Sequence, residues 1–138
     1  MILYLDTSAL VKLVHREEGS GQVRDAFGRA EAVAASVLAR IEVHSALARL
    51  AREGASDEVL RGWLSAFSTL WAGMARISMD RAADAACGLC LRHPLRALDA
   101  IHLASALLLR AEGLEVVFAT WDARLAAAAR QEGLPVLE

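Results

Sequence analysis

The chain of 138 residues has only two cysteines and two prolines, and Lys12 is its only lysine. A disulfide framework of the kind that staples small secreted domains is therefore excluded, so apolar residues have to supply the core. No apolar run approaches the roughly 18 to 20 residues that cross a bilayer. The amino terminus lacks a basic segment and reaches Asp6 almost at once, unlike a signal peptide. We expect one domain, residues 1–138, with reduced thiols in the cytoplasm.

Several motifs of known chemistry are also missing. The sequence has no G-x-S-x-G nucleophile elbow, no P-loop and no G-x-G-x-x-G. Cys87 and Cys90 lie inside a predicted helix with two residues between them. A zinc site would need two further ligands, and only His93 is near. We interpret this cysteine pair as packing residues. Nucleophilic serine or cysteine catalysis and nucleotide binding by a glycine loop are not indicated.

The charge balance does not identify a partner by itself. The formal net charge is −2, which does not indicate a nucleic-acid-binding protein. Because Lys12 is the only lysine, arginine supplies all the other basic residues, and its planar guanidinium suits phosphate. An arginine-rich and alanine-rich composition can equally reflect coding bias, so charge alone decides nothing.

Short apolar runs alternate with longer amphipathic segments along the chain, whose hydrophobic content is 56%. The runs predict strands over residues 2–5, 32–35, 74–77, 115–119 and 136–137. The segments between them predict helices over 8–15, 22–29, 37–52, 57–71, 79–93, 95–110 and 122–130. This alternation predicts an α/β fold, with helices on both faces of a mostly parallel sheet of four to five strands. The common order for such a sheet is 3-2-1-4-5.

The first strand runs directly into an acid. Ile2 to Leu5 is unbroken apolar sequence, as in a strand buried on both faces, and Asp6 follows at its carboxyl end. Open α/β sheets place their ligand sites at that edge. Asp6 could equally cap the next helix, a role open to any Asp in this position. We expect Thr7 and Ser8 to satisfy the helix start and to leave Asp6 free.

The helix predicted over residues 37–52 carries a second acid of interest, Glu42. Ser36 is its expected N-cap. An apolar series at helical spacing is expected to face inward: Val37, Ile41, His44 and Ala48. On that pattern Glu42 belongs to the solvated side. Its place in the first turns after a strand nevertheless brings it near the carboxyl edge of the sheet.

Four acids at strand ends or helix starts are expected at this one edge: Asp6, Glu42, Asp99 and Asp122. Like charges this close raise one another's pKa unless a cation neutralises them. An all-oxygen cluster suits Mg²⁺ or Mn²⁺, which polarise a phosphoryl oxygen and lower the pKa of bound water. Thr7 and Thr120 are candidate hydroxyl partners. His102 is interpreted as a core or supporting histidine, in preference to a fifth ligand.

Arginines near the acids in sequence are candidates for phosphate contacts: Arg40, Arg49, Arg96 and Arg124. The aromatic helix from Trp63 to Trp71 is interpreted as core or interface packing, and it is a candidate dimer surface.

Four ordered segments resemble the PIN domain, and within that family the VapC toxins of bacterial and archaeal VapBC toxin–antitoxin modules. They are Asp6-Thr7-Ser8-Ala9-Leu10, Ser36-x5-Glu42, Leu95-Arg-x-Leu-Asp99-Ala-x-His102-Leu-Ala and Thr120-x-Asp122. The resemblance implies a three-layer α/β/α sandwich and a Mg²⁺-dependent endoribonuclease. It also implies that Asp6, Glu42, Asp99 and Asp122 form the acidic metal site, with Asp6 and Asp99 the most direct ligands and Thr120 a supporting hydroxyl. Trp121 departs from the family pattern, in which a smaller residue is more usual.

The resemblance further implies partners and a reaction. A homodimer would be inhibited by a small VapB antitoxin whose carboxyl-terminal segment lies across the active-site groove, in a heterotetramer or a larger assembly. Metal-activated water would cleave RNA to leave 5′-phosphate and 3′-hydroxyl ends.

Two alternatives remain open. A receiver-like signalling module normally has an acidic pair after its first strand and a late lysine, whereas this chain has Asp6-Thr7 and only Lys12. A PIN nuclease that processes RNA or cuts DNA without an antitoxin generally carries extra segments for its substrate. A short upstream gene for an antitoxin would favour the toxin.

Overall fold

A parallel sheet forms the centre of the computed structural model, which describes residues 1–138. Its strands are β1 (Ile2–Leu5), β2 (Ala32–Ser36), β3 (Ala75–Ile77), β4 (Val116–Ala119) and β5 (Val136–Leu137). They lie in the order β3-β2-β1-β4-β5, and every pair is parallel. The predicted order 3-2-1-4-5 is confirmed, and each strand lies within one residue of its predicted range.

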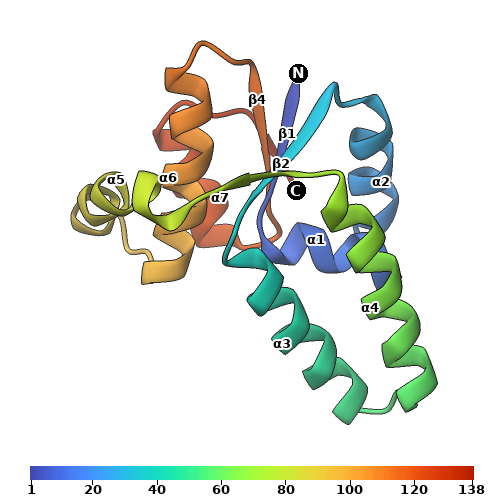
Figure 1. Ribbon diagram of the computed structural model, residues 1–138. Coiled ribbons are helices and arrows are strands. Elements are labelled where there is room, and N and C mark those ends of the chain that lie inside the picture. The colour runs from blue at the N-terminus through green and yellow to red at the C-terminus, as the bar shows by residue number, and fades with distance from the viewer.

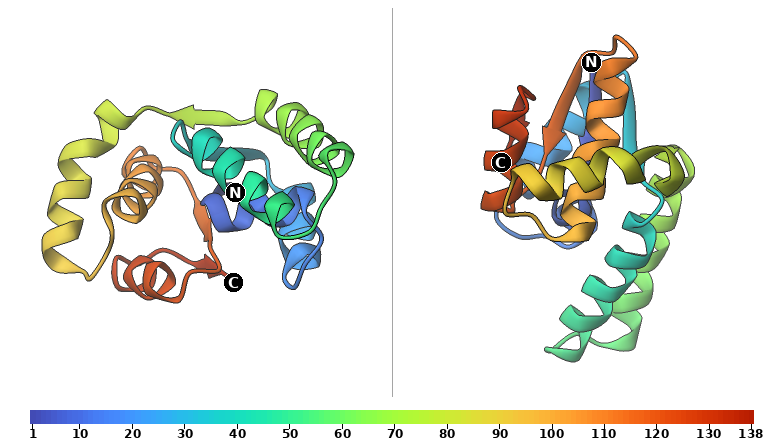
Figure 2. Two further views of the ribbon diagram at one scale, coloured as in Figure 1. Left: turned by 90° about the horizontal axis from the view of Figure 1, so that it is seen from below. Right: turned by 90° about the vertical axis from the view of Figure 1, so that its left-hand side faces the viewer.

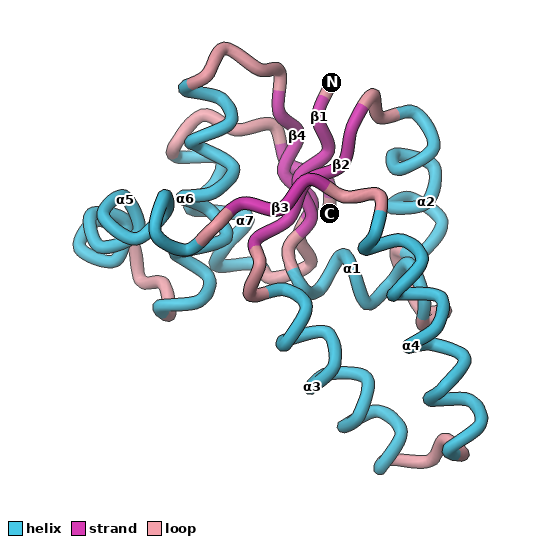
Figure 3. The backbone as a smooth tube through the Cα atoms, viewed as in Figure 1, coloured by secondary structure: helices cyan, strands magenta, loops and turns pink.

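Helices cover both faces of the sheet, so the predicted three-layer α/β/α sandwich is also confirmed (Figure 1). The helices are α1 (Thr7–Val14), α2 (Ser20–Arg29), α3 (Ala39–Arg52), α4 (Asp57–Ala72), α5 (Met79–Arg92), α6 (Ala97–Ala111) and α7 (Ala123–Gln131). One core lies between the sheet and α5, α6 and α7, and the other lies beneath α1 to α4. The secondary-structure colouring shows the strands enclosed between these two sets of helices (Figure 3).

The central strand β1 contributes to both cores because successive side chains of a strand point to opposite faces. Tyr4 packs in the core of α5, α6 and α7, whereas Leu3 and Leu5 pack in the other core, and all three are fully buried. Strands β1 and β4 are in register, with Leu5 beside Ala119. The two residues that follow, Asp6 and Thr120, therefore leave the sheet together at its carboxyl edge.

Helices α3 and α4 pack against each other and extend beyond the sheet as an arm (Figure 2). Ser56 caps α4 and accepts a hydrogen bond from the Val59 amide at 3.2 Å. Phe67 and Trp71 face inward, so this part of the aromatic series serves as core packing. No helix in the structure combines the length and the apolar character that crossing a bilayer requires.

The predicted inward face of α3 is wrong. Ile41 is 71% exposed and Val37 is also exposed, whereas Ala39, Val43 and Leu47 point into the core. Both series have helical spacing, so periodicity alone could not choose between them. The helix starts at Ala39, later than predicted, and its packing in the core beneath α1 to α4 buries the second series.

Two further local predictions are wrong. Ser36 does not cap α3: it is the fully buried last residue of β2, and its hydroxyl accepts a bond from the Leu38 amide at 3.3 Å. Cys87 and Cys90 do not pack in the core, because they lie on the exposed side of α5 as free thiols. The core side of α5 is occupied by Ala82, Ala86 and Leu89 instead.

Candidate active site

Asp6 stands at the junction of β1 and α1, where it is both the N-cap of the helix and part of the site. Its Oδ1 accepts hydrogen bonds from the Ala9 amide at 2.9 Å and the Ser8 hydroxyl at 2.7 Å. Its Oδ2 accepts one from the Thr120 hydroxyl at 2.5 Å. The expectation that Thr7 and Ser8 would cap the helix and free Asp6 is therefore wrong. A carboxylate has about four acceptor positions, so three donors still leave one for a ligand.

The environment of Asp6 disfavours its charge. Only 4% of the residue is exposed. Burial raises the pKa of Asp6 above its usual range, and the nearby His102 and the bonds from Thr120, Ala9 and Ser8 offset only part of that rise. A cation beside Asp6 would favour the carboxylate form.

Glu42 enters the same site from the first turn of α3. Its Oε1 lies 2.7 Å from Nε2 of His102, a residue of α6 that is 1% exposed. Burial by itself raises the pKa of Glu42, but the hydrogen bonds from His102 and Thr7 outweigh it, so the net pKa is lowered. Glu42 is therefore an ionised carboxylate at neutral pH.

Asp99 and Asp122 form the third side of the site, with Arg96 between them. Asp99 lies in the first turn of α6, and Asp122 caps α7 by accepting the Leu125 amide at 2.9 Å. Nε of Arg96 is 3.5 Å from Asp99, and one terminal nitrogen is 3.9 Å from Asp122. Burial and the charge of Asp122 raise the pKa of Asp99, which Arg96 offsets only in part.

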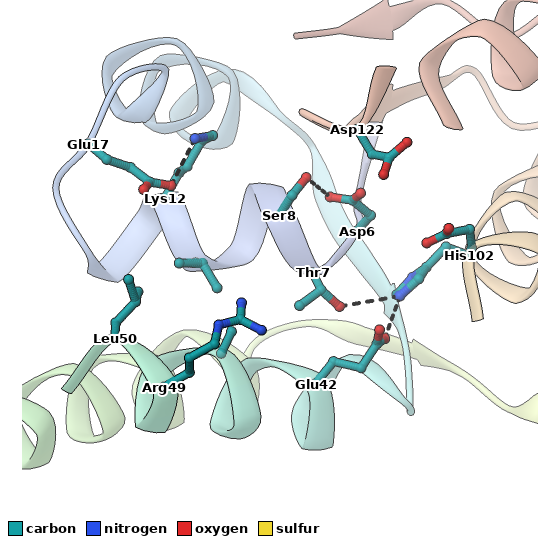
Figure 4. Close-up of a pocket in the computed structure, with 13 residues that line it drawn as sticks. Asp6, Thr7, Ser8, Lys12, Glu17, Glu42, Arg49, Leu50, His102 and Asp122 are labelled. Atoms are coloured by element: carbon teal, nitrogen blue, oxygen red, sulfur yellow. Dashed lines mark hydrogen bonds and ion pairs between the residues drawn. The ribbon is translucent and has the colours of Figure 1, made fainter. Parts of the chain in front are cut away.

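One open pocket of about 330 Å³ joins these groups (Figure 4). The four predicted acids all line it: Asp6, Glu42, Asp99 and Asp122. They come from four segments that are distant in sequence, and the prediction that these acids share one edge of the sheet is confirmed by the pocket they line. Thr120, the predicted supporting hydroxyl, is fully buried behind Asp6.

The wall of the pocket opposite Asp99 and Asp122 was not foreseen from the sequence. Ser8, Lys12 and Glu17 line it, and Lys12 Nζ lies 2.8 Å from Glu17 and 5.2 Å from the centre of the Trp121 ring. The only feature of the sequence that could have pointed to this wall is Lys12, the one charged residue in the otherwise apolar stretch from Ala9 to Val14. The sequence could not bring Glu17 or Trp121 to it, because their approach depends on how α2 and α7 pack.

The predicted phosphate-binding arginines divide into two groups. Arg96 lies over the acids, and Arg49 lines the pocket from α3. Arg40 lines a separate hollow with Ile41 and His44, and Arg124 lies in another beside His93. The structure does not bring Arg40 or Arg124 to the acidic pocket.

The donor set has the chemistry of a hard-cation site, because carboxylate oxygens predominate. No three His, Cys, Asp or Glu side chains stand close enough together to hold one ion directly. Mg²⁺ usually keeps several waters and binds through one or two carboxylates. The residues therefore fit a hydrated hard ion that contacts few of the acids directly, and they do not form a closed cage.

Comparison with known proteins agrees with this geometry. The family model described as PIN domain matches residues 3–131. Ribonuclease VapC45 of Mycobacterium tuberculosis is 36% identical over 141 residues, an alignment that covers 98% of this chain and 94% of the relative. The chain belongs to the VapC group of the PIN-domain family.

Solved structures share the fold of this PIN-domain chain. A toxin–antitoxin complex from Klebsiella pneumoniae matches with a TM-score of 0.62 and 24% identity, covering 99% of this chain and 96% of the other. VapC20 of Mycobacterium tuberculosis, described as a sarcin-ricin loop cleaving toxin, matches with a TM-score of 0.65 and 18% identity, covering 91% and 94% of the two chains.

Proposed function

We propose that this PIN-domain protein is a metal-dependent endoribonuclease toxin that hydrolyses RNA phosphodiester bonds and is neutralised by a cognate antitoxin. The observation that carries the proposal is the meeting of Asp6, Glu42, Asp99 and Asp122 in one pocket at the carboxyl edge of the sheet. The name of the relative, Ribonuclease VapC45, supports the nuclease activity. The Klebsiella pneumoniae toxin–antitoxin complex supports the antitoxin partner.

Mg²⁺, or Mn²⁺ in its place, is the proposed cofactor. Asp6 and Asp99 would be its most direct ligands, and Asp122 and Glu42 would complete the acidic metal site. Once bound, such an ion polarises a phosphoryl oxygen and makes a coordinated water more acidic. The raised pKa values of Asp6 and Asp99 support this assignment, because a cation would relieve the cost of their ionisation.

The chain's own residues supply the rest of the reaction. Glu42, whose lowered pKa keeps it ionised, accepts a proton from the attacking water. The water oxygen bonds to phosphorus, and the bond from phosphorus to the 3′ oxygen breaks. The 3′ oxygen then takes a proton from solvent, leaving 5′-phosphate and 3′-hydroxyl ends.

Arginine side chains provide the affinity for RNA, because an acidic pocket repels phosphate until a cation is bound. Arg96 and Arg49 contact phosphates near the site of cleavage in this proposal. Arg40 and Arg124 lie in separate hollows, and their contact with phosphate stays a prediction. Each phosphate contact adds salt dependence to binding.

The antitoxin is proposed to be a small VapB-type protein whose carboxyl-terminal segment lies across the pocket. The toxin is proposed to be a homodimer that forms a heterotetramer or a larger assembly with it, with the helix from Trp63 to Trp71 as the candidate dimer surface. Both cysteines are free, which suits the reducing cytoplasm where the RNA substrate is found.

The central test compares Asp6→Asn and Asp99→Asn with the wild type and with Asp25→Asn, an exposed position on α2. RNA cleavage in Mg²⁺ should fall by about 100-fold or more in the two site variants. It should remain at the wild-type level in Asp25→Asn. Full activity in both site variants, or cleavage that persists in EDTA, would refute the proposal. Expression with and without the antitoxin, followed by mapping of RNA 5′ ends, tests the toxin role and identifies the target.

A further inference from the structure

The His102 ring connects the core of the protein to an acid of the site. Its Nδ1 lies 3.2 Å from the Tyr4 hydroxyl on β1, and its Nε2 lies 2.7 Å from Glu42 Oε1 on α3. Tyr4 is fully buried and His102 is 1% exposed. Figure 4 shows the ring directed at Glu42 and Thr7, both of which line the pocket. Three elements distant in sequence thus meet in one hydrogen-bonded chain.

The partners of the ring determine which nitrogen carries hydrogen. A carboxylate can only accept, so the hydrogen in the 2.7 Å contact between Glu42 and His102 belongs to Nε2. The buried Tyr4 hydroxyl is a phenol that can donate its hydrogen, and it faces Nδ1 at 3.2 Å. In the neutral ring, Nδ1 is then the acceptor for Tyr4. Both contacts therefore favour one tautomer.

Glu42 depends on this contact for its direction. Its only ion-pair partner is His102, and no arginine or lysine fixes the carboxylate from the other side. Thr7 is a weaker partner of the pair, with its hydroxyl 3.4 Å from the same Nε2. The Glu42 side chain is 22% exposed, so without this contact it would be free to sample several rotamers.

We propose that Tyr4 and His102 form a buried relay of hydrogen bonds that holds the Glu42 carboxylate in place, so that His102 is a positioning residue and not a metal ligand. The catalytic consequence rests on the proposed function, whereas the hydrogen-bond arrangement itself does not. Groups that hydrogen-bond to the carboxylate ligands of a metal hold those ligands in place, and loss of such support costs about 10- to 100-fold in metal affinity or activity.

The first test reads the tautomer in the full-length, metal-free protein. The ¹⁵N chemical shifts of His102 should show a hydrogen on Nε2. In Tyr4→Phe, which keeps the aromatic ring and removes the hydroxyl, the share of rings protonated at Nδ1 should rise. A wild-type ring protonated only at Nδ1 would overturn the relay. This measurement decides the relay even if the protein proves not to cleave RNA.

The second test separates positioning from packing. His102→Gln carries an amide nitrogen at about the position of Nε2, whereas the shorter His102→Asn does not reach Glu42. Mn²⁺ affinity, measured by calorimetry, and RNA cleavage should both fall about 10- to 100-fold in His102→Asn. His102→Gln should recover most of each loss. Equal losses in the two variants would show a packing role only. If His102→Asn does not fold, a rate and Mn²⁺ affinity for Tyr4→Phe equal to wild type would overturn the proposal.

A double-mutant cycle tests whether His102 acts through Glu42. Because His102 acts through Glu42, His102→Asn should weaken Mn²⁺ binding less than about twofold further in a Glu42→Gln background. Losses that simply multiply would mean that His102 acts independently of Glu42. If the wild type binds Mn²⁺ normally but leaves RNA intact, the proposed function fails and the cycle still decides the relay.

Discussion

The Thr120 hydroxyl donates a hydrogen bond of 2.5 Å to Oδ2 of Asp6, a residue 114 positions earlier in the chain. The contact exists because β1 and β4 are neighbours in register and both end at this edge. The Thr120 oxygen also accepts a bond from the Asp122 amide at 3.1 Å. One buried hydroxyl thus ties two of the four acids to the same point of the sheet.

Thr120→Val should destabilise the protein and weaken the site. The change keeps the side-chain shape but removes the hydroxyl, so Asp6 Oδ2 and the Asp122 amide each lose a partner. Loss of buried partners of this kind costs about 1–3 kcal/mol of unfolding free energy. The pKa of Asp6 should also rise further, because the bond from Thr120 favours its charged form.

Urea unfolding of Thr120→Val beside Thr69→Val measures this cost. The Thr69 hydroxyl is exposed on α4 and bonds only to the Ser65 carbonyl, so its loss should change stability by less than about 0.5 kcal/mol. Similar losses for the two variants would mean that the Thr120 hydroxyl is not a special support of Asp6.

Asp99→Asn should stabilise the metal-free protein. Burial and Asp122 raise the folded-state pKa of Asp99 above the ordinary 3.8, so its ionisation opposes folding. This penalty is absent below the unfolded pKa, grows as pH rises, and is complete above the folded pKa. Asparagine avoids it. The ion pair that Asp99 forms with Arg96 stabilises the fold only weakly, because Arg96 is 79% exposed. We expect a gain on the order of 1 kcal/mol or less at pH 7, after allowance for solvent screening.

Thermal melts of wild type and Asp99→Asn from pH 3 to pH 8 measure how the stability difference between them changes with pH. The two curves should converge near pH 3 and separate as pH rises. Saturating Mg²⁺ should reverse the order, because a ligand at 100 times its Kd adds about 2.7 kcal/mol to the protein that binds it. If the metal-free wild type is more stable than Asp99→Asn at pH 7, ionisation of Asp99 does not oppose folding and this prediction is wrong.

Arg49→Ala should raise the KM for RNA more than Arg40→Ala does. Both arginines lie on α3 and are exposed, but only Arg49 lines the acidic pocket. Loss of one phosphate contact should reduce the slope of log KM against log salt by about 0.7 for a single-stranded substrate. The kinetics of both variants at several salt concentrations give this slope. An equal effect of Arg40→Ala would extend the RNA path to the outer side of α3.

The sequence predicted most of the sheet, because buried parallel strands are continuous apolar runs bounded by glycine, proline or polar residues. It also predicted the edge on which the four acids lie, since Asp6 and Asp122 each follow a strand. The PIN-domain match and the shared pocket confirm the fold and the meeting of these acids. Their role as metal ligands stays a prediction.

The spacing of apolar residues did not predict which face of α3 is buried, because two different series on this helix both have helical spacing. The face of α3 that is buried is decided by how the helix packs against α1 and α4, which the spacing of its apolar residues does not reveal. The sequence does not reveal the dual role of Asp6, whose two carboxylate oxygens let it cap α1 and face the pocket at once. The contacts from Tyr4 to His102 and from Lys12 to Glu17 depend on side-chain directions that a single sequence does not contain.

Gly19→Ala should destabilise the protein more than Gly113→Ala, although both glycines have φ of +86°. The left-handed conformation costs an alanine about 1–2 kcal/mol at either position. A Cβ at Gly113 would meet open space, whereas one at Gly19 would lie 2.5 Å from Nε1 of Trp121. Overpacking adds about 1–3 kcal/mol at Gly19 alone.

Because Trp121 lies next to the site, RNA cleavage gives a second measurement that distinguishes Gly19→Ala from Gly113→Ala. Trp121 lies between Thr120 and Asp122, and its amide donates to the Ser8 hydroxyl at 2.8 Å. If the methyl group introduced by Gly19→Ala pushes the indole away, the two neighbouring site residues should shift as well, so RNA cleavage should fall in Gly19→Ala and stay normal in Gly113→Ala. Denaturant unfolding and initial rates of both variants measure the two effects. Equal losses of stability in the two variants would show that the Trp121 indole moves aside without cost, and this prediction would then be wrong.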